Sequence, residues 1–477
     1  MLRIQRNPKV QFLGERLFYS MLKPFTLVAT VAAILWFSGL NHFVSAQPPE
    51  AGAGTGESQT GHEGHDHGTE TASDGPTSFD PAQMTEDELL KMFRSQVDEQ
   101  TYKLGQEALE RFKSQSEELK KVVTEMRVVH TKIRNHIIDD QPRYIELRDQ
   151  SRKQIGKTYR AALDLLDFMP HASAMQFVNT MIQQRMQYGV YDAETKEGAA
   201  KLLDYNASYV HLALATARAA TMTGDFVTAQ RVYEKLDPEK EMEDLDRRLF
   251  ATQEELKEQF QIEQALRDND PDDLPKVRLK TTRGDILVEL YINEAPSTVA
   301  NFIRLVEEGF YDGLDFFQVV DHVLAITGDP LGDGSSIPEK FLQDEDKRDT
   351  VRMPLYGSLV MAKLPVPNTK DFVPNSAGTQ FAILFSPLPH ISHSQTIFGR
   401  VIEGFDVLGS LERMDPTKEK KKNEIAYPPD RIVEATVINR PDTLPEIKYV
   451  DPTAGRSATV PANPDLPPLN LGAPATR

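Results

Sequence analysis

The sequence predicts a multidomain protein in which an all-α helical region precedes a closed antiparallel β-barrel with two capping helices. The chain has 477 residues, which is more than one hydrophobic core normally uses. From residue 84 to 270, apolar residues recur at three- and four-residue spacing, the period of an amphipathic helix. From Pro275 they fall in short runs separated by turns, which is typical of antiparallel strands.

The composition excludes several function classes. The chain holds 54 Lys and Arg against 72 Asp and Glu, a formal net charge of −18. A general nucleic-acid binder is therefore not expected, because the chain has no excess of cations to replace phosphate counterions. There is no cysteine, so disulfides, zinc-thiolate sites, thiol nucleophiles and a cysteine-linked lipid anchor are excluded.

Residues 1–46 are typical of an export signal. The apolar run 25–40 is shorter than the ~20 residues that span a bilayer, and cations precede it. Val44-Ser45-Ala46 then offers a cleavage site with small residues. Translation from Met21 instead of Met1 would give a signal of ordinary length. The sequence predicts an exported protein of the periplasm or cell envelope; the alternative is an uncleaved membrane anchor.

Residues 47–83 are predicted to be a disordered tether, because they contain almost no aliphatic side chains. The tether carries His62, His65 and His67 with two nearby carboxylates. Imidazoles at this spacing are candidate ligands for Zn, Cu or Ni and would make a metal-buffering protein; the alternative is a polar linker. No other metal and no cofactor is expected.

The region 84–270 is predicted to be a helical interaction domain that recruits a protein partner. Thr85 and Glu88 form a capping box at its start, and Gln141-Pro142 interrupts the helical pattern. Helices are expected at 144–169, 172–188, 196–220, 225–236 and, as a charged connector, from 239 to about 267.

One part of this region resembles the helix-turn-helix of tetratricopeptide repeats. Its small residues Ala213, Ala217 and Ala220 precede a Gly224-Asp225 turn. The match covers about one repeat, which cannot bury its own face. The region is therefore expected to be a helical bundle or short solenoid, with a repeat array that binds peptides as the alternative.

The C-terminal domain, 275–440, is predicted to be a capped barrel. Strands are expected at 276–280 and 286–290, joined by a turn at 283–285, and a helix follows Pro296. Further strands are expected at 315–320, 358–363, 379–384 and 396–401. The Pro-rich tail 441–477 is expected to be disordered, and the cationic run 418–422 to be a solvated loop.

Several segments of this domain resemble the cyclophilin-type peptidyl-prolyl isomerases. They are the run RGDILVELYINEAPSTVANFIRLVEEGFYDGLDFFQVV, the turn 328–330, the segment 375–381, and His390-Ile391 followed by 396–401. Their order and spacing are close to those of the family over about residues 276–440. The resemblance implies an eight-stranded antiparallel barrel with two capping helices that acts on proline-containing clients.

Catalysis of this kind lowers a barrier of about 18–20 kcal/mol to rotation about the amide bond before proline. It requires an apolar pocket for the ring, donors for the flanking backbone, and one strong donor that weakens amide resonance. The resemblance places an arginine at that last position, but this chain has Gln318 after Phe316-Phe317. Gln318 is the catalytic candidate, an uncharged donor expected to cost about 10- to 100-fold in rate.

The resemblance also carries over a peptide-binding set, part matching and part substituted. We expect Gln380 and the Ala362 backbone to hold the peptide, and Leu324, Phe381 and Ile391 to line the proline site. The remaining members of the set, three of them substituted relative to the family, are Ile326, Ala382, His390 and Gln395.

Two hypotheses remain open from the sequence. One is an isomerase of weakened or altered activity that acts on exported or envelope proteins. The other is a non-catalytic scaffold whose barrel holds proline segments while the helical domain recruits the partner. Membrane contact is expected only if residues 1–46 are retained.

Overall fold

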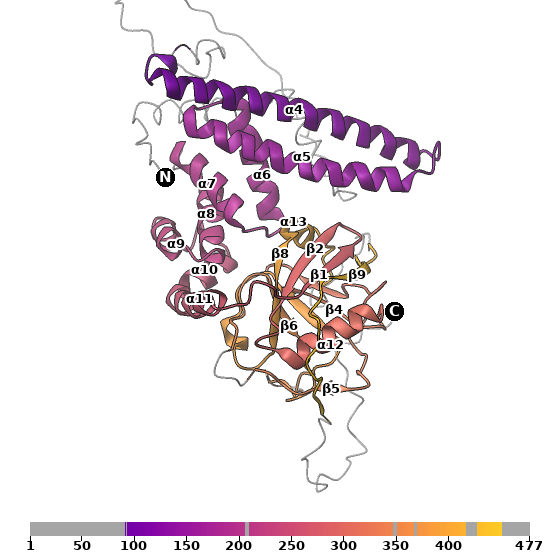
Figure 1. Ribbon diagram of the computed structural model, residues 1–477. Helices are drawn as coiled ribbons and strands as arrows, with labels where there is room; N and C mark the ends of the chain where they lie inside the picture. Colours follow the sequence, from indigo (N-terminus) through magenta and orange to yellow (C-terminus); the bar gives the residue numbers. More distant parts are fainter. Residues whose placement is uncertain are drawn as a thin grey trace, which may run out of the picture. The chain divides into compact units, whose positions relative to one another are not determined.

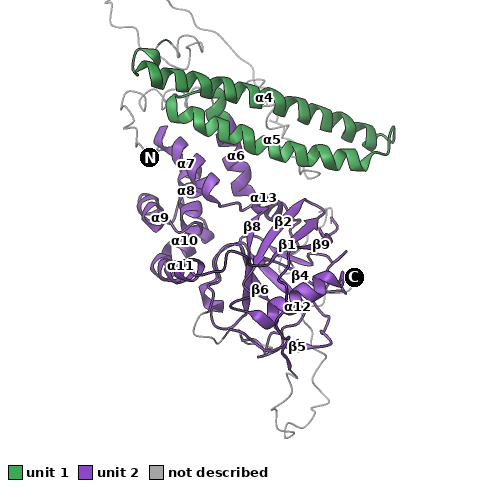
Figure 2. Ribbon diagram, viewed as in Figure 1, with its two compact units in different colours: residues 1–176 green, residues 177–477 purple. Residues whose placement is uncertain are grey.

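The computed structural model describes residues 91, 93–205, 209–346, 351–366, 369, 371–415 and 427–450. The chain divides into two compact units, residues 1–176 and 177–477 (Figure 2). The predicted signal segment, the histidine tether, the Thr85 cap, the 418–422 loop and residues 451–477 lie outside the described residues. Within the described part, no helix is both long and apolar enough to cross a membrane.

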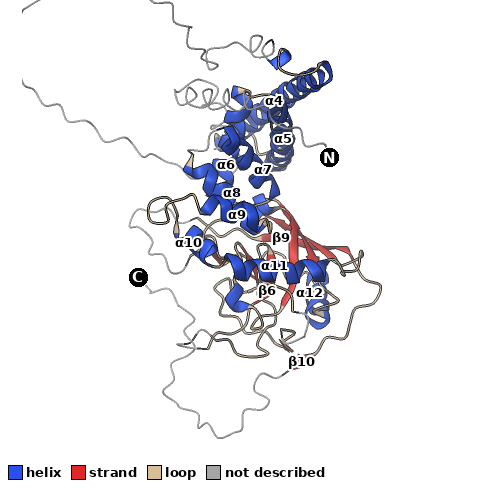
Figure 3. Cartoon of the chain, turned by 90° about the vertical axis from the view of Figure 1, so that its left-hand side faces the viewer, coloured by secondary structure: helices blue, strands red, loops and turns tan. Residues whose placement is uncertain are grey.

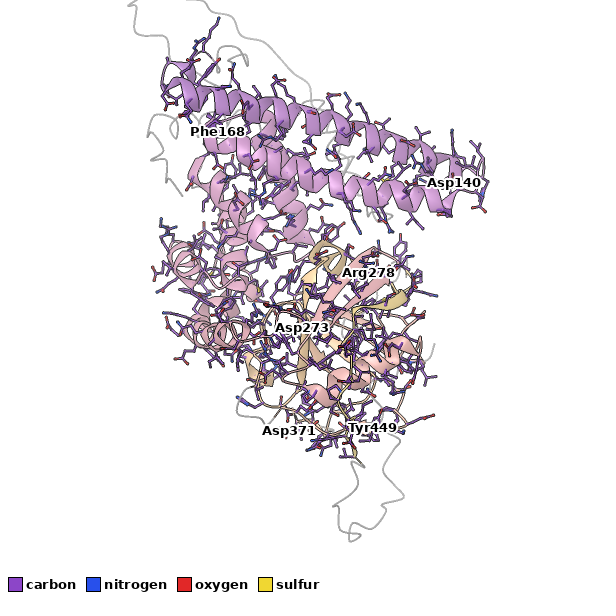
Figure 4. The ribbon with its side chains drawn as sticks, viewed as in Figure 1. Asp140, Phe168, Asp273, Arg278, Asp371 and Tyr449 are labelled. Atoms are coloured by element: carbon purple, nitrogen blue, oxygen red, sulfur yellow. The ribbon has the colours of Figure 1, made fainter. Side chains whose placement is uncertain are left out.

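The first unit is built on a long helical hairpin. Helices α4 (Glu99–Arg134) and α5 (Gln141–Phe168) lie side by side (Figure 1), and Figure 4 marks the two ends of α5 at Asp140 and Phe168. The Asp98 carboxylate caps α4 by accepting from the Thr101 amide at 2.8 Å. Pro142, expected to interrupt the helix, instead lies in the first turn of α5, where proline's missing N–H costs nothing.

The second unit starts with shorter helices, and two expected helices are each divided. The predicted 196–220 helix is α7 (Ala193–Tyr205) and α8 (Val210–Met222). The predicted connector is α10 (Asp244–Ala251) and α11 (Gln253–Arg267), separated at Thr252. The connector starts late because Glu243 and Asp246 form a capping box there. Helices α6 (Ala172–Gln187) and α9 (Phe226–Tyr233) agree with expectation to within a few residues.

The strands all belong to the second unit (Figure 3). The sheet order is β3-β4-β7-β6-β8-β2-β1-β9 and every pair is antiparallel. The strands are β1 (Lys276–Thr281), β2 (Asp285–Leu290), β3 (Gln318–Val320), β4 (Leu324–Thr327), β6 (Ser358–Met361), β7 (Phe381–Leu384), β8 (Ile397–Glu403) and β9 (Ile432–Asn439).

The two ends of this sheet meet, which confirms the predicted barrel. The segment before β3 pairs with the start of β9: the Phe316 amide donates to the Asp430 carbonyl at 2.8 Å, and the Gly313 amide to the Ile432 carbonyl at 2.7 Å. Helix α12 (Pro296–Glu307) presents a buried face to the interior, and Phe302 packs there against Tyr311, Phe381 and Phe398. Helix α13 (Phe405–Gly409) is the second helix of the barrel.

The chain beyond residue 440 continues the fold for ten residues, contrary to the expectation of a disordered tail from 441. Strand β10 (Tyr449–Val450) pairs with β5 (Phe341–Leu342), and the Tyr449 hydroxyl donates to Asn301 Oδ1 at 2.9 Å. Leu444, Ile447 and Tyr449 pack against the barrel core. Its composition did not predict this structure, because its few apolar residues are buried only by packing against the folded barrel.

Candidate active site

Four predicted or neighbouring site positions form one row across the sheet. Gln318 on β3 is in register with Ile326 on β4, which is in register with Ala382 on β7, and Ala382 is in register with Val360 on β6. Side chains at paired positions lie on the same face of a sheet. Gln318 and Ile326 are half-buried, whereas Ala382 and Val360 are buried. The hairpin β3–β4 therefore presents Gln318 beside Ile326 and Ala382.

Phe381 does not belong to this row, so the prediction that it lines the proline site is wrong. It is 0% exposed and packs edge-on against Phe302, with ring centroids 5.3 Å apart, and against Tyr311 at 5.6 Å. The physical reason is strand alternation: Ala382 and its neighbour Phe381 must lie on opposite faces. Phe381 therefore anchors the barrel core.

Leu324 and Ile391, both predicted to line the proline site, share one set of buried neighbours. Both pack against one buried group, called here the apolar cluster, which consists of Leu274, Tyr291, Val360, Leu384, Leu388 and Ile397. Ile391 belongs to the short helix η2 (Pro389–Ile391), in which the preceding His390 is exposed. The cluster supplies an apolar wall adjacent to the Gln318 row, through the shared residue Val360.

Ala362 and Gln380 line a small pocket of about 60 Å³. The Ala362 amide donates to the Gln380 carbonyl at 3.0 Å, so of the two backbone groups of Ala362 only the carbonyl is left for a peptide. The Gln380 side-chain amide donates to the carbonyls of Ser336 (3.2 Å) and Gly334 (3.4 Å). These bonds hold its side chain against the 334–336 loop. The other lining residues are Gly334, Ser336, Pro338, Lys363, Leu364, Pro365, Ser376, Gly378 and Thr379.

The segment between Ala362 and Pro374 contributes directly to this pocket. Pro365 and Phe372 form an isolated bridge, and the Val373 amide donates to the Leu364 carbonyl at 2.8 Å. Leu364 and Pro365 then line the pocket wall. Residues 364–366 thus pair with residues 371–373.

Lys363 is a pocket residue that sequence reasoning missed. Its ammonium group lies 2.9 Å from Asp344 Oδ2, pairs with Asp346, and donates to the Ser394 carbonyl at 2.7 Å. All three side chains are nearly inaccessible to solvent. No spacing in the sequence links position 363 to 344 or 346, so only the fold reveals this buried ion cluster.

Gln395 lies deeper than expected. It is 4% exposed, and its Oε1 finds no hydrogen-bond donor among the described residues. Gln395 is not among the residues that line the pocket at Ala362 and Gln380. The described residues contain no group of three or more His, Cys, Asp or Glu side chains arranged to hold a metal ion; the three candidate histidines of the tether lie outside them.

Known proteins are similar in sequence to this barrel. A family model described as cyclophilin type peptidyl-prolyl cis-trans isomerase matches residues 276–437. The chain is 37% identical over 163 residues to the peptidyl-prolyl cis-trans isomerase cypE of Dictyostelium discoideum, across 34% of this chain and 96% of that protein. It is 35% identical over 147 residues to peptidyl-prolyl cis-trans isomerase-like 3 of Gallus gallus, across 30% of this chain and 85% of that protein.

Among solved structures, a cyclophilin type isomerase of Cryptosporidium parvum, crystallised in the presence of the dipeptide Ala-Pro, is 26% identical. The match covers 35% of this chain and 99% of that one, with a TM-score of 0.29. The relatives matched almost end to end are named as isomerases, and the sequence match coincides with the barrel described above. The chain therefore belongs, through residues 276–437, to the cyclophilin-type peptidyl-prolyl cis-trans isomerase family.

Proposed function

We propose that the barrel is a peptidyl-prolyl isomerase of reduced rate that acts on exported or envelope proteins. The observation that carries the proposal is the row of Gln318, Ile326 and Ala382 on one face of three adjacent strands. It places a hydrogen-bond donor next to an apolar surface. In this row the donor is neutral, and a methyl group stands at the Ala382 position.

The proposed mechanism needs no covalent step. Leu324 and Ile391, which are partly buried and pack on the apolar cluster, take the proline ring, and the pocket at Ala362 and Gln380 takes the flanking peptide. The Gln318 side-chain amide donates a hydrogen bond toward the prolyl nitrogen as the amide twists. Resonance weakens as that nitrogen becomes pyramidal, and only then is the bond strong, so it lowers the barrier.

The size of the effect follows from the donor. A hydrogen bond from a neutral amide is about half as strong as one from a guanidinium. The difference of roughly 1–3 kcal/mol corresponds to about 10- to 100-fold in rate. The small side chain of Ala382 further reduces the surface available to the ring.

The test is an NMR exchange assay on Ala-Pro peptides with the full chain, comparing wild type, Gln318→Ala and Gln318→Arg. We expect the wild type to accelerate exchange, the alanine variant to lose that acceleration, and the arginine variant to gain about 10- to 100-fold. Gln343→Arg is the matched control, because it adds the same charge at an exposed position. It should leave the rate unchanged.

The second candidate function is a binding scaffold without catalysis. It is favoured by the same two features, the neutral Gln318 and the missing side chain at Ala382, since both reduce transition-state stabilisation. In this case the helical region recruits a partner and the barrel holds its proline segments. Peptide binding by the wild type with exchange at the buffer rate would establish this candidate and exclude the first.

The export part of the proposal rests on residues 1–46 alone. It is tested by N-terminal sequencing of the protein recovered from the envelope fraction. A mature chain that starts at Gln47 supports export with cleavage, and a retained N-terminus supports an anchor. Recovery only with the proteins that are not exported would contradict both.

A further inference from the structure

The helical part of the second unit supplies a buried carboxylate to the back of the apolar cluster. Glu263, on α11, is 2% exposed and lies outside the 276–437 family match. Its Oε1 lies 3.3 Å from Arg352 Nη1, and its Oε2 accepts from the Met353 amide at 3.1 Å. Arg352 is 1% exposed. Glu263 thus joins a helix to a chain segment that leads into β6.

The same carboxylate reaches the cluster itself. Tyr291, a cluster member, donates its hydroxyl to Glu263 Oε1 at 3.4 Å. The Arg352 guanidinium lies over the Tyr291 ring, 4.0 Å from the centroid. Arg267 of α11 also donates to Glu263 at 2.9 Å, and Arg352 pairs with Asp270. Two cations and two carboxylates therefore balance around Glu263 and Arg352, which are themselves nearly inaccessible to solvent, so that their mutual interaction is strong.

Segment 352–354 in turn supports η2, which carries Ile391. The Leu388 amide donates to the Pro354 carbonyl at 2.9 Å, and the Ser392 hydroxyl contacts the Met353 sulfur at 3.9 Å. These contacts lie on both sides of the short helix. Helix α11 also approaches η2 directly. A displacement of 352–354 would move the wall that Ile391 forms with Leu324.

We infer that Glu263 is a positioning residue for the proline site: through Arg352, Met353 and Tyr291 it sets the place of the η2 wall. The affinity of the barrel for proline therefore depends on a helix outside the family match. The inference rests on the proposed function, since it assigns Leu324 and Ile391, on the apolar cluster, to the proline ring. Gln318 stands on β3, and none of the bonds that link Glu263 to the η2 wall involves a residue of β3, so the rate at saturation should be independent of Glu263.

The test uses the full chain with Glu263→Gln, which keeps the shape and an acceptor for the Met353 amide but removes the charge. Tyr291→Phe removes only the hydroxyl bond and is the variant to rely on if Glu263→Gln fails to fold. Glu258→Gln, an exposed position on the same helix, is the matched control. Affinity for an Ala-Pro peptide and exchange at saturating peptide are measured by NMR, and amide hydrogen exchange is measured over residues 385–392.

We expect Glu263→Gln to weaken peptide affinity by about five- to tenfold and Tyr291→Phe by about twofold, with the saturated rate within twofold of wild type. Amide exchange over 385–392 should accelerate in Glu263→Gln and not in Glu258→Gln. If the folded variants bind the peptide with the same affinity as the wild type and show unchanged amide hydrogen exchange over 385–392, the inference is overturned. If the wild type itself binds no peptide, the proposed function fails, while the amide exchange over 385–392 still decides whether Glu263 positions η2.

Discussion

At the scale of single residues, Lys363 is the most consequential side chain that the sequence concealed. Its ammonium group pairs with both Asp344 and Asp346, and it also donates a hydrogen bond to the Ser394 carbonyl. Asp344 is itself bonded to Asn375 at both its amide and its carboxylate, at 2.8 Å each. One ammonium group therefore joins the end of β6 to two loops, 344–346 and that of Ser394, and Asp344 extends the connection to Asn375.

Replacing Lys363 should be costly for stability. Lys363→Met leaves two buried carboxylates beside each other without a counter-charge, so we expect the free energy of unfolding to fall by about 3–5 kcal/mol. Urea denaturation measures it. Adding Asp346→Asn to the variant should restore part of the loss, because one of the two unpaired charges is then removed. Lys257→Met, at an exposed ion pair on α11, should change stability by less than about 1 kcal/mol; equal effects of the two lysine substitutions would contradict the assignment.

At the scale of elements, β10 is a strap on the barrel. Its strand pairing is only two residues long, but the segment also contributes Tyr449, which lies under Lys340 Nζ at 4.9 Å from the ring centroid. The Lys448 amide donates to Ser297 Oγ at 2.9 Å, at the start of α12. The strap thus links β5 to the capping helix.

A pair of truncations tests the strap. A chain that ends at residue 450 should unfold like the full chain. A chain that ends at 440 should lose about 2–3 kcal/mol, since it exposes the core under Leu444, Ile447 and Tyr449 and removes the bond to Asn301. Chemical denaturation of the two truncated chains measures this difference. Equal free energies of unfolding would show that the strap does not stabilise the barrel.

At the scale of the molecule, the barrel is not separable from the helices of its own unit without loss. Besides Glu263, the Tyr356 hydroxyl bonds Gly189, and Arg413 bonds the Tyr188 carbonyl, both at 3.4 Å. Both carboxylates that pair with Arg352 precede the barrel: Glu263 belongs to α11, and Asp270 follows that helix. A barrel cut at residue 275 would expose these groups or leave them unpaired.

A fragment 275–450 lacks the two carboxylates that pair with Arg352, so we expect its free energy of unfolding to be about 3–5 kcal/mol lower than that of a fragment 177–450. This difference corresponds to a melting temperature about 10 °C lower. Differential scanning calorimetry of the two fragments measures this difference. Adding Arg352→Met to the shorter fragment should recover part of it, because an apolar side chain needs no counter-charge. Identical melting temperatures would indicate that the barrel is autonomous.

The sequence by itself determined the order of the parts, the helical periods of 93–268, the barrel class, and the family, because each depends on local pattern or on motifs kept in order. It also singled out Gln318, Ile326 and Ala382 as candidates, and the strand pairing places these three positions in register. It misplaced Phe381, since a binding motif names positions without saying which way each side chain points.

Only the tertiary structure decided the contacts between distant segments. The Lys363 cluster, the β10 strap and the Glu263 network are held by pairs of residues between 17 and 109 positions apart. Nothing local in the chain specifies these pairs, because a buried charge is tolerated only when a counter-charge arrives from elsewhere in the fold. Local pattern thus determines which elements form, whereas burial and charge pairing determine which of them line the candidate site.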